Sequence, residues 1–209
     1  MTEVEFGRYP QDPEAYENGK RISIANGKPQ FNPLAQQPIK WLVLAEEDDR
    51  MLLLSKYVLD YLPFNGWTAD VTWESCTLRG WLNGAYKFKN ADGDEVSFLD
   101  DCFSEKERNR LVSHGETGDK VFLFSLDEVL KYLTTNYLRK CLPTAYAVSR
   151  LPETNIYNDG DTCDWWLRTE SLEAKRFFMI VERKGTYFKH GEMVSMKGIG
   201  VRPALWVRK

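Results

Sequence analysis

Two arginines in the last third of the chain could bind an anion, because each lies in an apolar stretch. Arg168 follows two tryptophans and a leucine, and Arg202 lies between a valine and a proline. A guanidinium presents a planar fork of N–H donors that matches a carboxylate or a phosphate. The alternative is that each arginine bonds backbone carbonyls or a buried acid, and the proline after Arg202 favours this interpretation. We therefore assign a structural role to Arg168, Arg202, Trp166 and Trp206.

Oxygen-bearing side chains are concentrated just before the two tryptophans and could bind calcium. They are Asn155, Asn158, Asp159, Asp161 and Asp164. The stretch lacks the spacing of an EF-hand and its distal glutamate, and a turn rich in Asn, Asp and Gly explains it equally well. His114 and His190 have no partner at metal-ligand spacing. We expect no metal and no other cofactor, and calcium at Asp159 and Asp161 is the weaker interpretation.

Familiar catalytic motifs are absent from the sequence, which contains no GxSxG, no HExxH and no glycine-rich phosphate loop. The cysteines stand far apart, with no CxxC pair that would indicate a redox motif or a zinc ribbon. They are Cys76, Cys102, Cys141 and Cys163. We expect four reduced, partly buried thiols and no enzymatic activity. An enzyme that uses Cys163 is the alternative.

The composition is typical of a globular protein, with 43% hydrophobic and 28% charged residues in a chain of 209. A net charge of −3 with mixed signs gives no basic footprint for nucleic acid. No apolar run approaches the ~20 residues of a membrane span, and the first residues lack the features of a signal peptide. We expect one domain over residues 1–209, cytoplasmic by default, with neither nucleic acid nor membrane as a partner.

Strand patterns occupy the first part of the chain. Residues 4–9 alternate and stop at a proline, and residues 39–44 and 51–57 are typical of two strands joined by a charged turn. The near-continuous apolar character of residues 51–57 predicts burial on both faces. Residues 11–38 are rich in Pro, Asn, Gly and Gln, and we expect a long loop or flap with a hairpin around Asn26-Gly27.

Helical patterns occupy the middle of the chain, residues 75–134. Helices are predicted over residues 75–85, 104–112 and 125–134. The serine that begins the first can cap it. The other two begin with capping boxes, in which a serine and a glutamate three residues later satisfy each other's free amides. After Pro143 the helical signals stop.

The last third of the chain indicates short strands and tight turns. Strands are predicted over residues 165–168, 176–182, 186–189, 192–196 and 201–207. Lys184-Gly185 and His190-Gly191 are predicted turns, and Pro203 limits the pairing of the last strand. Strands at both ends with helices between them predict an α+β domain whose terminal strands pair in one antiparallel sheet.

Long motifs of this chain recur in the same order in one bacterial family. They include Phe6-Gly7-Arg8-Tyr9-Pro10-Gln11, Leu52-Leu53-Leu54-Ser55-Lys56-Tyr57, Trp73-Glu74-Ser75-Cys76-Thr77-Leu78-Arg79-Gly80-Trp81-Leu82-Asn83, Trp165-Trp166-Leu167-Arg168 and Gly200-Val201-Arg202-Pro203-Ala204-Leu205-Trp206. The chain resembles this uncharacterised domain family, whose members look like C-type-lectin folds, over nearly its whole length. The resemblance implies a C-type-lectin-like single domain with an irregular ligand face over residues 169–199.

Some relatives resemble the targets of diversity-generating retroelements, which vary the segment between the last two motifs by mutating the adenines of AAY codons. In this chain residues 169–199 contain no Asn, and they contain Glu, Lys and Met, which such changes cannot produce. We therefore expect a fixed copy, with a retroelement-diversified binding protein as an alternative. Formylglycine-generating oxidases share the broader fold, but their chemistry needs a close pair of cysteines, and Cys163 has no near neighbour in sequence.

The predicted function is a non-catalytic module that displays residues 169–198 to a protein or other macromolecular ligand. Aromatic side chains bring large contact area at low entropic cost, so Tyr187 and Phe188 are the foremost candidates. The candidate ligand-binding residues are Thr169, Ser171, Arg176, Phe178, Tyr187, Phe188 and His190. Calcium-dependent sugar binding is not supported, because the chain has no Glu-Pro-Asn or Trp-Asn-Asp element.

Overall fold

The first of two five-stranded sheets collects strands from both ends of the chain. The computed structural model describes residues 1–11, 24–25, 28–29, 36–89, 93–151 and 161–209. In this sheet the order is β1-β4-β5-β14-β9, and every neighbouring pair is antiparallel. Its strands are β1 (Glu3–Pro10), β4 (Gln36–Glu46), β5 (Arg50–Ser55), β14 (Ala204–Arg208) and β9 (Leu111–Val112).

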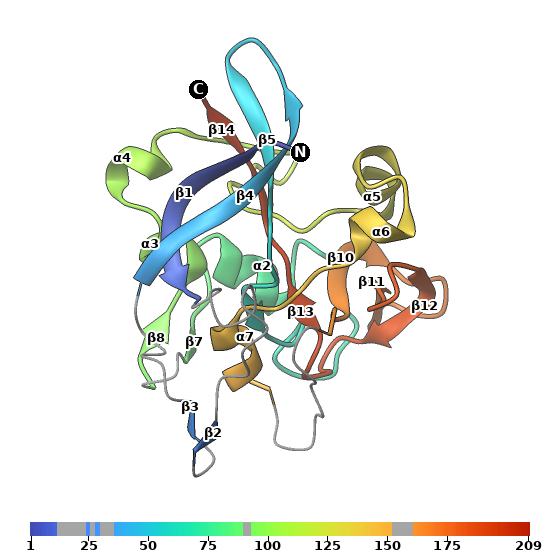
Figure 1. Ribbon diagram of the computed structural model, residues 1–209. Helices are drawn as coiled ribbons and strands as arrows, with labels where there is room; N and C mark the ends of the chain where they lie inside the picture. Colours follow the sequence, from blue (N-terminus) through green and yellow to red (C-terminus); the bar gives the residue numbers. More distant parts are fainter. Residues whose placement is uncertain (12–23, 26–27, 30–35, 90–92, 152–160) are drawn as a thin grey trace.

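The two terminal strands share this sheet but do not pair with each other. Strands β4 and β5 lie between β1 and β14, and the two ends of the chain emerge at the same end of the molecule (Figure 1). The predicted direct pairing is therefore wrong, whereas the common antiparallel sheet is present. The central strand β5 has Leu52, Leu53 and Leu54 all buried. Successive side chains of a strand point to opposite faces, so both faces of β5 are covered, as its apolar run predicted.

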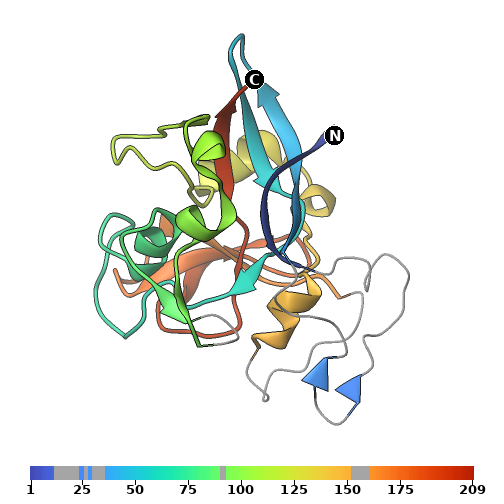
Figure 2. The same cartoon turned by 90° about the vertical axis from the view of Figure 1, so that its left-hand side faces the viewer.

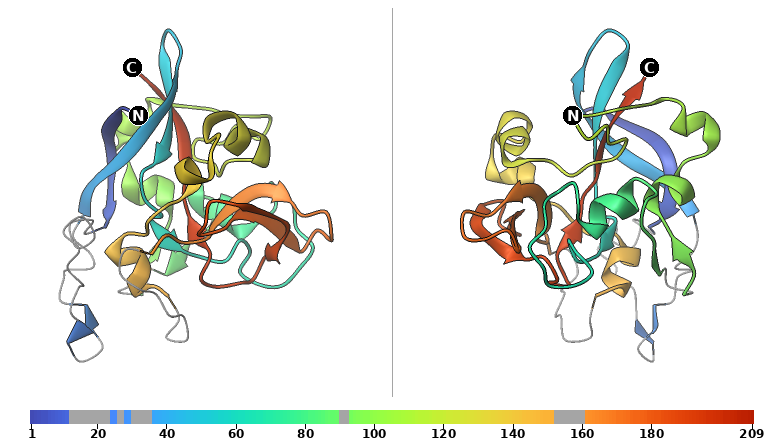
Figure 3. Two further views of the ribbon diagram at one scale, coloured as in Figure 1. Left: turned by 45° about the vertical axis from the view of Figure 1, so that its right-hand side comes forward. Right: turned by 180° about the vertical axis from the view of Figure 1, so that it is seen from behind.

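The second sheet has the order β12-β11-β10-β13-β6, antiparallel except for the parallel contact of β10 with β13. Its strands are β12 (Tyr187–Met193), β11 (Phe177–Val181), β10 (Trp165–Glu170), β13 (Gly200–Val201) and β6 (Asp60–Tyr61). These strands run across the direction of β4 and β5 (Figure 3). The single strand predicted over residues 201–207 is wrong, because the chain passes from one sheet to the other at Arg202-Pro203.

The hairpin of β11 and β12 differs from its prediction in one respect. The expected turn at Lys184-Gly185 is present, but His190-Gly191 does not turn the chain, and β12 continues through it as one strand. The register between the two strands shifts between Phe178 and Ile180. Gly191 has a φ of +71°, a conformation that a bulge can require and that glycine adopts without strain.

Short helices of four to seven residues cover the sheets. They are α2 (Thr77–Leu82), α3 (Phe98–Cys102), α4 (Glu105–Arg108), α5 (Leu126–Tyr132), α6 (Asn136–Arg139) and α7 (Ala145–Ser149). Both predicted capping boxes, at Ser104 and Ser125, are present. No helix of the described residues has the length and apolar character needed to cross a membrane.

Three helix predictions need correction. The first helix is capped by Cys76, whose sulfur accepts from Arg79 N, because Ser75 instead binds the backbone of Thr72. The helix predicted over residues 104–112 ends at Arg108, since Leu111 and Val112 pair with β14. The prediction that no helix follows Pro143 is also wrong.

Helix α7 follows that proline directly. Thr144 caps it by accepting from Ala147 N at 3.1 Å.

One hydrophobic cluster runs between the layers, and its largest members include Trp41, Trp166 and Phe64. Two small hairpins complete the described strands, β2 (Ile24–Ala25) with β3 (Lys28–Pro29) and β7 (Phe88–Lys89) with β8 (Glu95–Val96), and Phe88 packs against the cluster. The β2–β3 pair flanks the hairpin predicted at residues 26–27, far from the tip of the β4–β5 hairpin (Figure 2). Residues 36–38 of the predicted flap belong instead to β4, and its residues 12–23, 26–27 and 30–35 lie outside the described residues.

Candidate functional site

The predicted ligand face does not form one continuous surface. Phe178 is fully buried and stacks on Phe64, with ring centroids 3.8 Å apart. Its prediction as a contact residue is wrong, because β11 is covered on both faces over residues 178–181. Thr169 is half-buried, and its hydroxyl accepts from Leu126 N at 2.8 Å. It holds the start of α5 in place.

Tyr187 and Phe188 are adjacent in β12 and therefore lie on opposite faces of the sheet. The Tyr187 ring lies 5.6 Å from the guanidinium carbon of Arg139. The Phe188 ring lies 5.5 Å from the His190 ring. Both aromatic side chains are half-buried. A single ligand on one face of the hairpin cannot contact both of them.

Ser171 and Arg176 lie on the loop between β10 and β11, and His190 lies in β12 on the same face as Phe188. The Ser171 hydroxyl donates to the His190 carbonyl at 2.7 Å. His190 Nδ1 lies 2.6 Å from Glu173 Oε1. These contacts fasten residues 171–173 onto β12. As exposed pairs they each contribute about 0–1 kcal/mol to stability, so their role is to set the position of the loop.

A third segment, residues 65–72, completes this surface and was not predicted from the sequence. Asn65 N donates to Val194 O at 2.8 Å. The hydroxyls of Thr68 and Ser195 are 2.7 Å apart. Arg176 Nε lies 3.3 Å from Asp70 Oδ1.

These bonds join residues 65–72, 171–176 and 190–196, which we name the three-loop surface. A tryptophan among turn residues, Asn65-Gly66-Trp67-Thr68, is the sequence signal that could have indicated it.

Large apolar side chains stand exposed on the three-loop surface. Trp67 is 58% exposed, Leu172 is 78% exposed and Met196 is 44% exposed. One such residue comes from each loop or its end. Folding leaves these groups in water, although the six other tryptophans of the chain are buried. Exposed apolar groups gathered on loops, with polar groups between them, are typical of an interaction surface.

Arg168 and Arg202, the two arginines that could have bound an anion, are both hydrogen-bonded within the protein. Arg168 donates through Nη1 to the Leu123 carbonyl and to Glu128 Oε2, the latter at 2.6 Å. His114 Nε2 lies 3.2 Å from the other oxygen of Glu128. Burial opposes the charged form of Glu128, but the bonds from His114 and Arg168 outweigh it and lower its pKa to about 2.

Arg202 is buried where the chain passes between the two sheets. Its Nε donates to Ser55 O at 3.1 Å, and its Nη1 donates to Arg139 O at 3.4 Å. The guanidinium carbon lies 5.1 Å from the centre of the Trp165 ring. Trp166 donates through Nε1 to Leu62 O at 3.0 Å. Trp206 is buried in β14, with the Arg50 guanidinium 4.8 Å from its ring.

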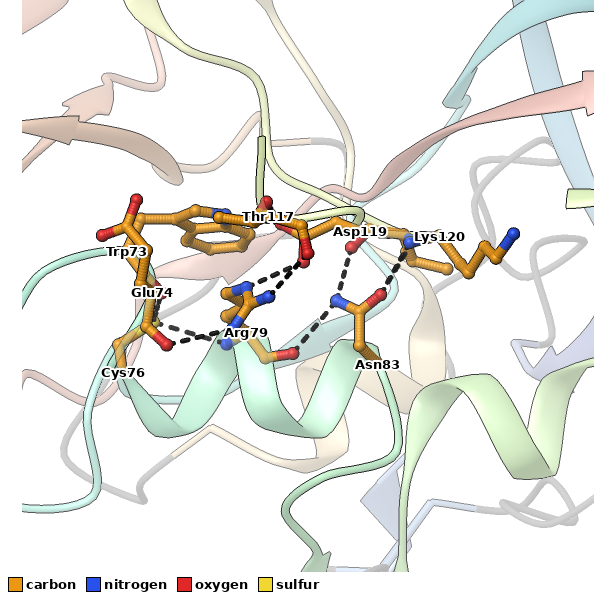
Figure 4. A network of polar contacts seen from close by, with 9 residues as sticks. Trp73, Glu74, Cys76, Arg79, Asn83, Thr117, Asp119 and Lys120 are labelled. Carbon is orange, nitrogen blue, oxygen red and sulfur yellow. Dashed lines mark hydrogen bonds and ion pairs between the residues drawn. The ribbon is translucent and has the colours of Figure 1, made fainter. Parts of the chain in front are cut away.

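The motif around α2 is held by one buried carboxylate (Figure 4). Asp119 accepts from Arg79 Nε at 2.7 Å, and from Trp73 Nε1 and Thr117 Oγ1 at 2.8 Å. Beside it, the Asn83 side chain bonds the backbone of residues 79, 120 and 121. These contacts explain the arginine, tryptophan and asparagine of this motif as parts of a clamp between α2 and residues 117–121.

The remaining chemical candidates are enclosed. All four cysteines are free and buried. Burial, followed by the neighbouring Cys141, raises the pKa of the Cys163 thiol well above its ordinary value, whereas a nucleophilic cysteine needs a lowered one.

Asp159 of the predicted calcium stretch lies outside the described residues, and Asp164 accepts from Arg183 N at 2.6 Å. Within the described ranges no three His, Cys, Asp or Glu side chains gather to hold a metal ion.

Comparison with known proteins gives a family. A profile described as a domain of unknown function (DUF6273) matches residues 48–209. Because the match covers most of the chain, the chain belongs to this family. No curated protein matched the sequence, and no solved structure matched either.

Proposed function

We propose that this DUF6273 chain is a non-catalytic binding module that takes a protein or other macromolecular ligand on the three-loop surface. The observation that carries the proposal is the exposure of Trp67, Leu172 and Met196 on loops that polar bonds tie together. Aromatic residues and Met are enriched at protein interfaces, and a few residues, with Trp prominent among them, supply most of the binding energy. Fixing them on bonded loops lowers the entropic cost of binding.

The surface differs from the face that the sequence predicted. It keeps Ser171, Arg176 and His190, and it replaces Tyr187 and Phe178 by Trp67 and its loop. The loop brings in a segment about 100 residues earlier in the chain. The surface also carries two charged pairs, Arg176 with Asp70 and His190 with Glu173, and protein interfaces commonly combine apolar contact residues with polar ones at the rim.

We also propose that the fold is C-type-lectin-like. Two features support this proposal: the strands from both ends of the chain lie in one antiparallel sheet, and a second sheet carries the loops of the proposed ligand face. In such an arrangement the first sheet holds the two ends of the chain together. The loops of the second sheet can then differ in sequence without changing the pairing of the first sheet.

The test is capture of a partner from a lysate of the source organism, followed by titration with the purified partner. The surface variant carries Trp67→Ser and Leu172→Ser. The matched control is Tyr137→Ser, because Tyr137 is 81% exposed on α6, outside the three-loop surface. We expect the surface variant to weaken the Kd by about 10- to 30-fold and the control to leave it unchanged.

Equal affinity of the surface variant and the wild-type chain would show that the surface is wrongly assigned. Conversion of the captured molecule by the chain, rather than simple binding, would contradict the non-catalytic assignment.

A further inference from the structure

The buried charges of this molecule are unevenly matched. The carboxylates that lie deep in the fold each face an arginine: Asp60 with Arg150, Asp119 with Arg79, and Glu128 with Arg168. Arg139 and Arg202 are also buried, yet neither has a carboxylate within 4.0 Å in the part of the chain that the structure describes. A buried charge without a partner carries a large desolvation cost.

Arg202 is compensated by neutral groups. Two backbone carbonyls accept from its guanidinium, and the Trp165 ring lies beneath it. Carbonyl dipoles and an aromatic face both stabilise a cation without a carboxylate.

Arg139 lacks that compensation. The residue is 6% exposed, and its Nη2 donates to Asn136 Oδ1 at 3.0 Å. Its Nε and Nη1 are buried and have no hydrogen-bond partner among the described residues. The Tyr187 ring near the guanidinium offers an aromatic face but no acceptor for these two nitrogens in the plane of the fork. The structure therefore holds a desolvated guanidinium with unused donors.

Arg139 is the last residue of α6, and α6 lies beside the strands β10 and β11 (Figure 1). Asn136, whose Oδ1 accepts from Arg139, is exposed. The turn at Gly185 packs tightly against α6 at Asn136. Lys189 Nζ lies 5.7 Å from the centre of the Tyr187 ring, and Arg202 donates to the Arg139 carbonyl, so both add positive charge near Arg139.

We propose that Arg139 binds an oxyanion, a carboxylate or phosphate group that enters beside Asn136 and lies between α6 and β12. A planar group with two or three oxygens can accept from both unused nitrogens at once. This oxyanion site lies on the Tyr187 face of β12, opposite Phe188 and His190. It is separate from the three-loop surface, and the proposed function does not depend on it.

The first test is thermal unfolding of the whole chain in sodium phosphate and in sodium acetate, each against sodium chloride at equal ionic strength. We expect the wild-type Tm to rise with oxyanion concentration and to reach about 2–4 °C at several times the Kd. A rise in phosphate alone identifies a phosphate group, and a rise in acetate identifies a carboxylate.

Arg139→Met is the informative variant, because Trp165 and Arg202 bond the Arg139 carbonyl and not its side chain. In chloride we expect this variant to melt at or above the wild-type temperature, since it removes an unpaired buried charge. In either oxyanion it should show no added rise. Arg183→Gln is the matched control, because Arg183 is exposed at the same hairpin, and it should respond like the wild-type chain.

A second measurement does not depend on any variant folding. In protein with ¹⁵N-labelled arginine, the Arg139 Nε–H signal is recognised by its nuclear Overhauser contacts to the Tyr187 ring. We expect this signal to shift on titration with the active oxyanion and to saturate. An unchanged or non-saturating signal, or an equal Tm rise in Arg139→Met, overturns the proposal.

Discussion

At the scale of single residues, Asp119 joins segments that are distant in the sequence. It accepts from Trp73, Arg79 and Thr117, so its removal leaves three donors without an acceptor. We expect Asp119→Ala to lower the free energy of unfolding by about 3 kcal/mol, the lower end for a broken buried pair, because Arg79 is partly in water. Urea unfolding measures the loss. Asp48→Ala, at the exposed tip of the β4–β5 hairpin, is the control and should change stability by less than about 0.5 kcal/mol.

Glu128 makes the stability of the fold depend on pH in the acid range. Its folded pKa of about 2 lies below its ordinary value of 4.5, so the stabilisation is complete above the unfolded pKa and is lost as the pH falls through the folded one. We expect the free energy of unfolding of the wild-type chain to exceed that of Glu128→Gln by about 3 kcal/mol at pH 7. At pH 3 we expect roughly half of that difference. Urea unfolding at several pH values checks this.

The control for this prediction is Glu116→Gln, which changes an exposed carboxylate in the segment that carries His114. It should match the wild-type stability within about 0.5 kcal/mol at every pH. A Glu128→Gln difference that stayed constant down to pH 3 would contradict the coupling to His114 and Arg168.

At the scale of elements, the docking of α6 on the β11–β12 hairpin depends on a glycine. Gly185 has a φ of +81°, and a Cβ there would lie 1.9 Å from Asn136 O. Gly118 has a φ of +67° with open space around it. We expect Gly118→Ala to cost about 1–2 kcal/mol from backbone strain alone, and Gly185→Ala to cost at least ~1 kcal/mol more through overpacking. Thermal unfolding measures both losses, and an equal loss of stability in Gly118→Ala and Gly185→Ala would contradict the tight contact.

Elements with strong local signals were predictable from the sequence, and those defined by distant partners were not. The serine–glutamate boxes at Ser104 and Ser125 specify their helix starts through bonds within one turn. The end at Arg108 was missed because pairing of Leu111 and Val112 with the last strand overrides helix propensity. The short helix α7 has only a threonine cap as its signal.

At the scale of the whole molecule, the proposed ligand surface was only partly predictable for the same reason. The sequence predicts it near the C-terminus, and the three-loop surface takes two of its three segments, those with Ser171 and His190, from that part of the chain. Alternation could not decide which of Tyr187 and Phe188 faces outward, because the other layers that cover each face come from elsewhere in the chain. The place of Trp67 in this surface could not be predicted from the sequence, because it depends on the contacts of residues 65–72 with residues 193–195.

The two-sheet scaffold and the three-loop surface should respond independently to mutation. Phe178 lies under that surface within the core, against Phe64, and Phe178→Ala should lower the free energy of unfolding by about 3–5 kcal/mol.

The variant with Trp67→Ser and Leu172→Ser removes side chains that are mostly in water, so its loss should stay within about 1 kcal/mol. Urea midpoints measure both effects. A large loss in the surface variant would mean that Trp67 and Leu172 stabilise the fold, and weaker ligand capture by that variant would then report unfolding rather than lost contacts.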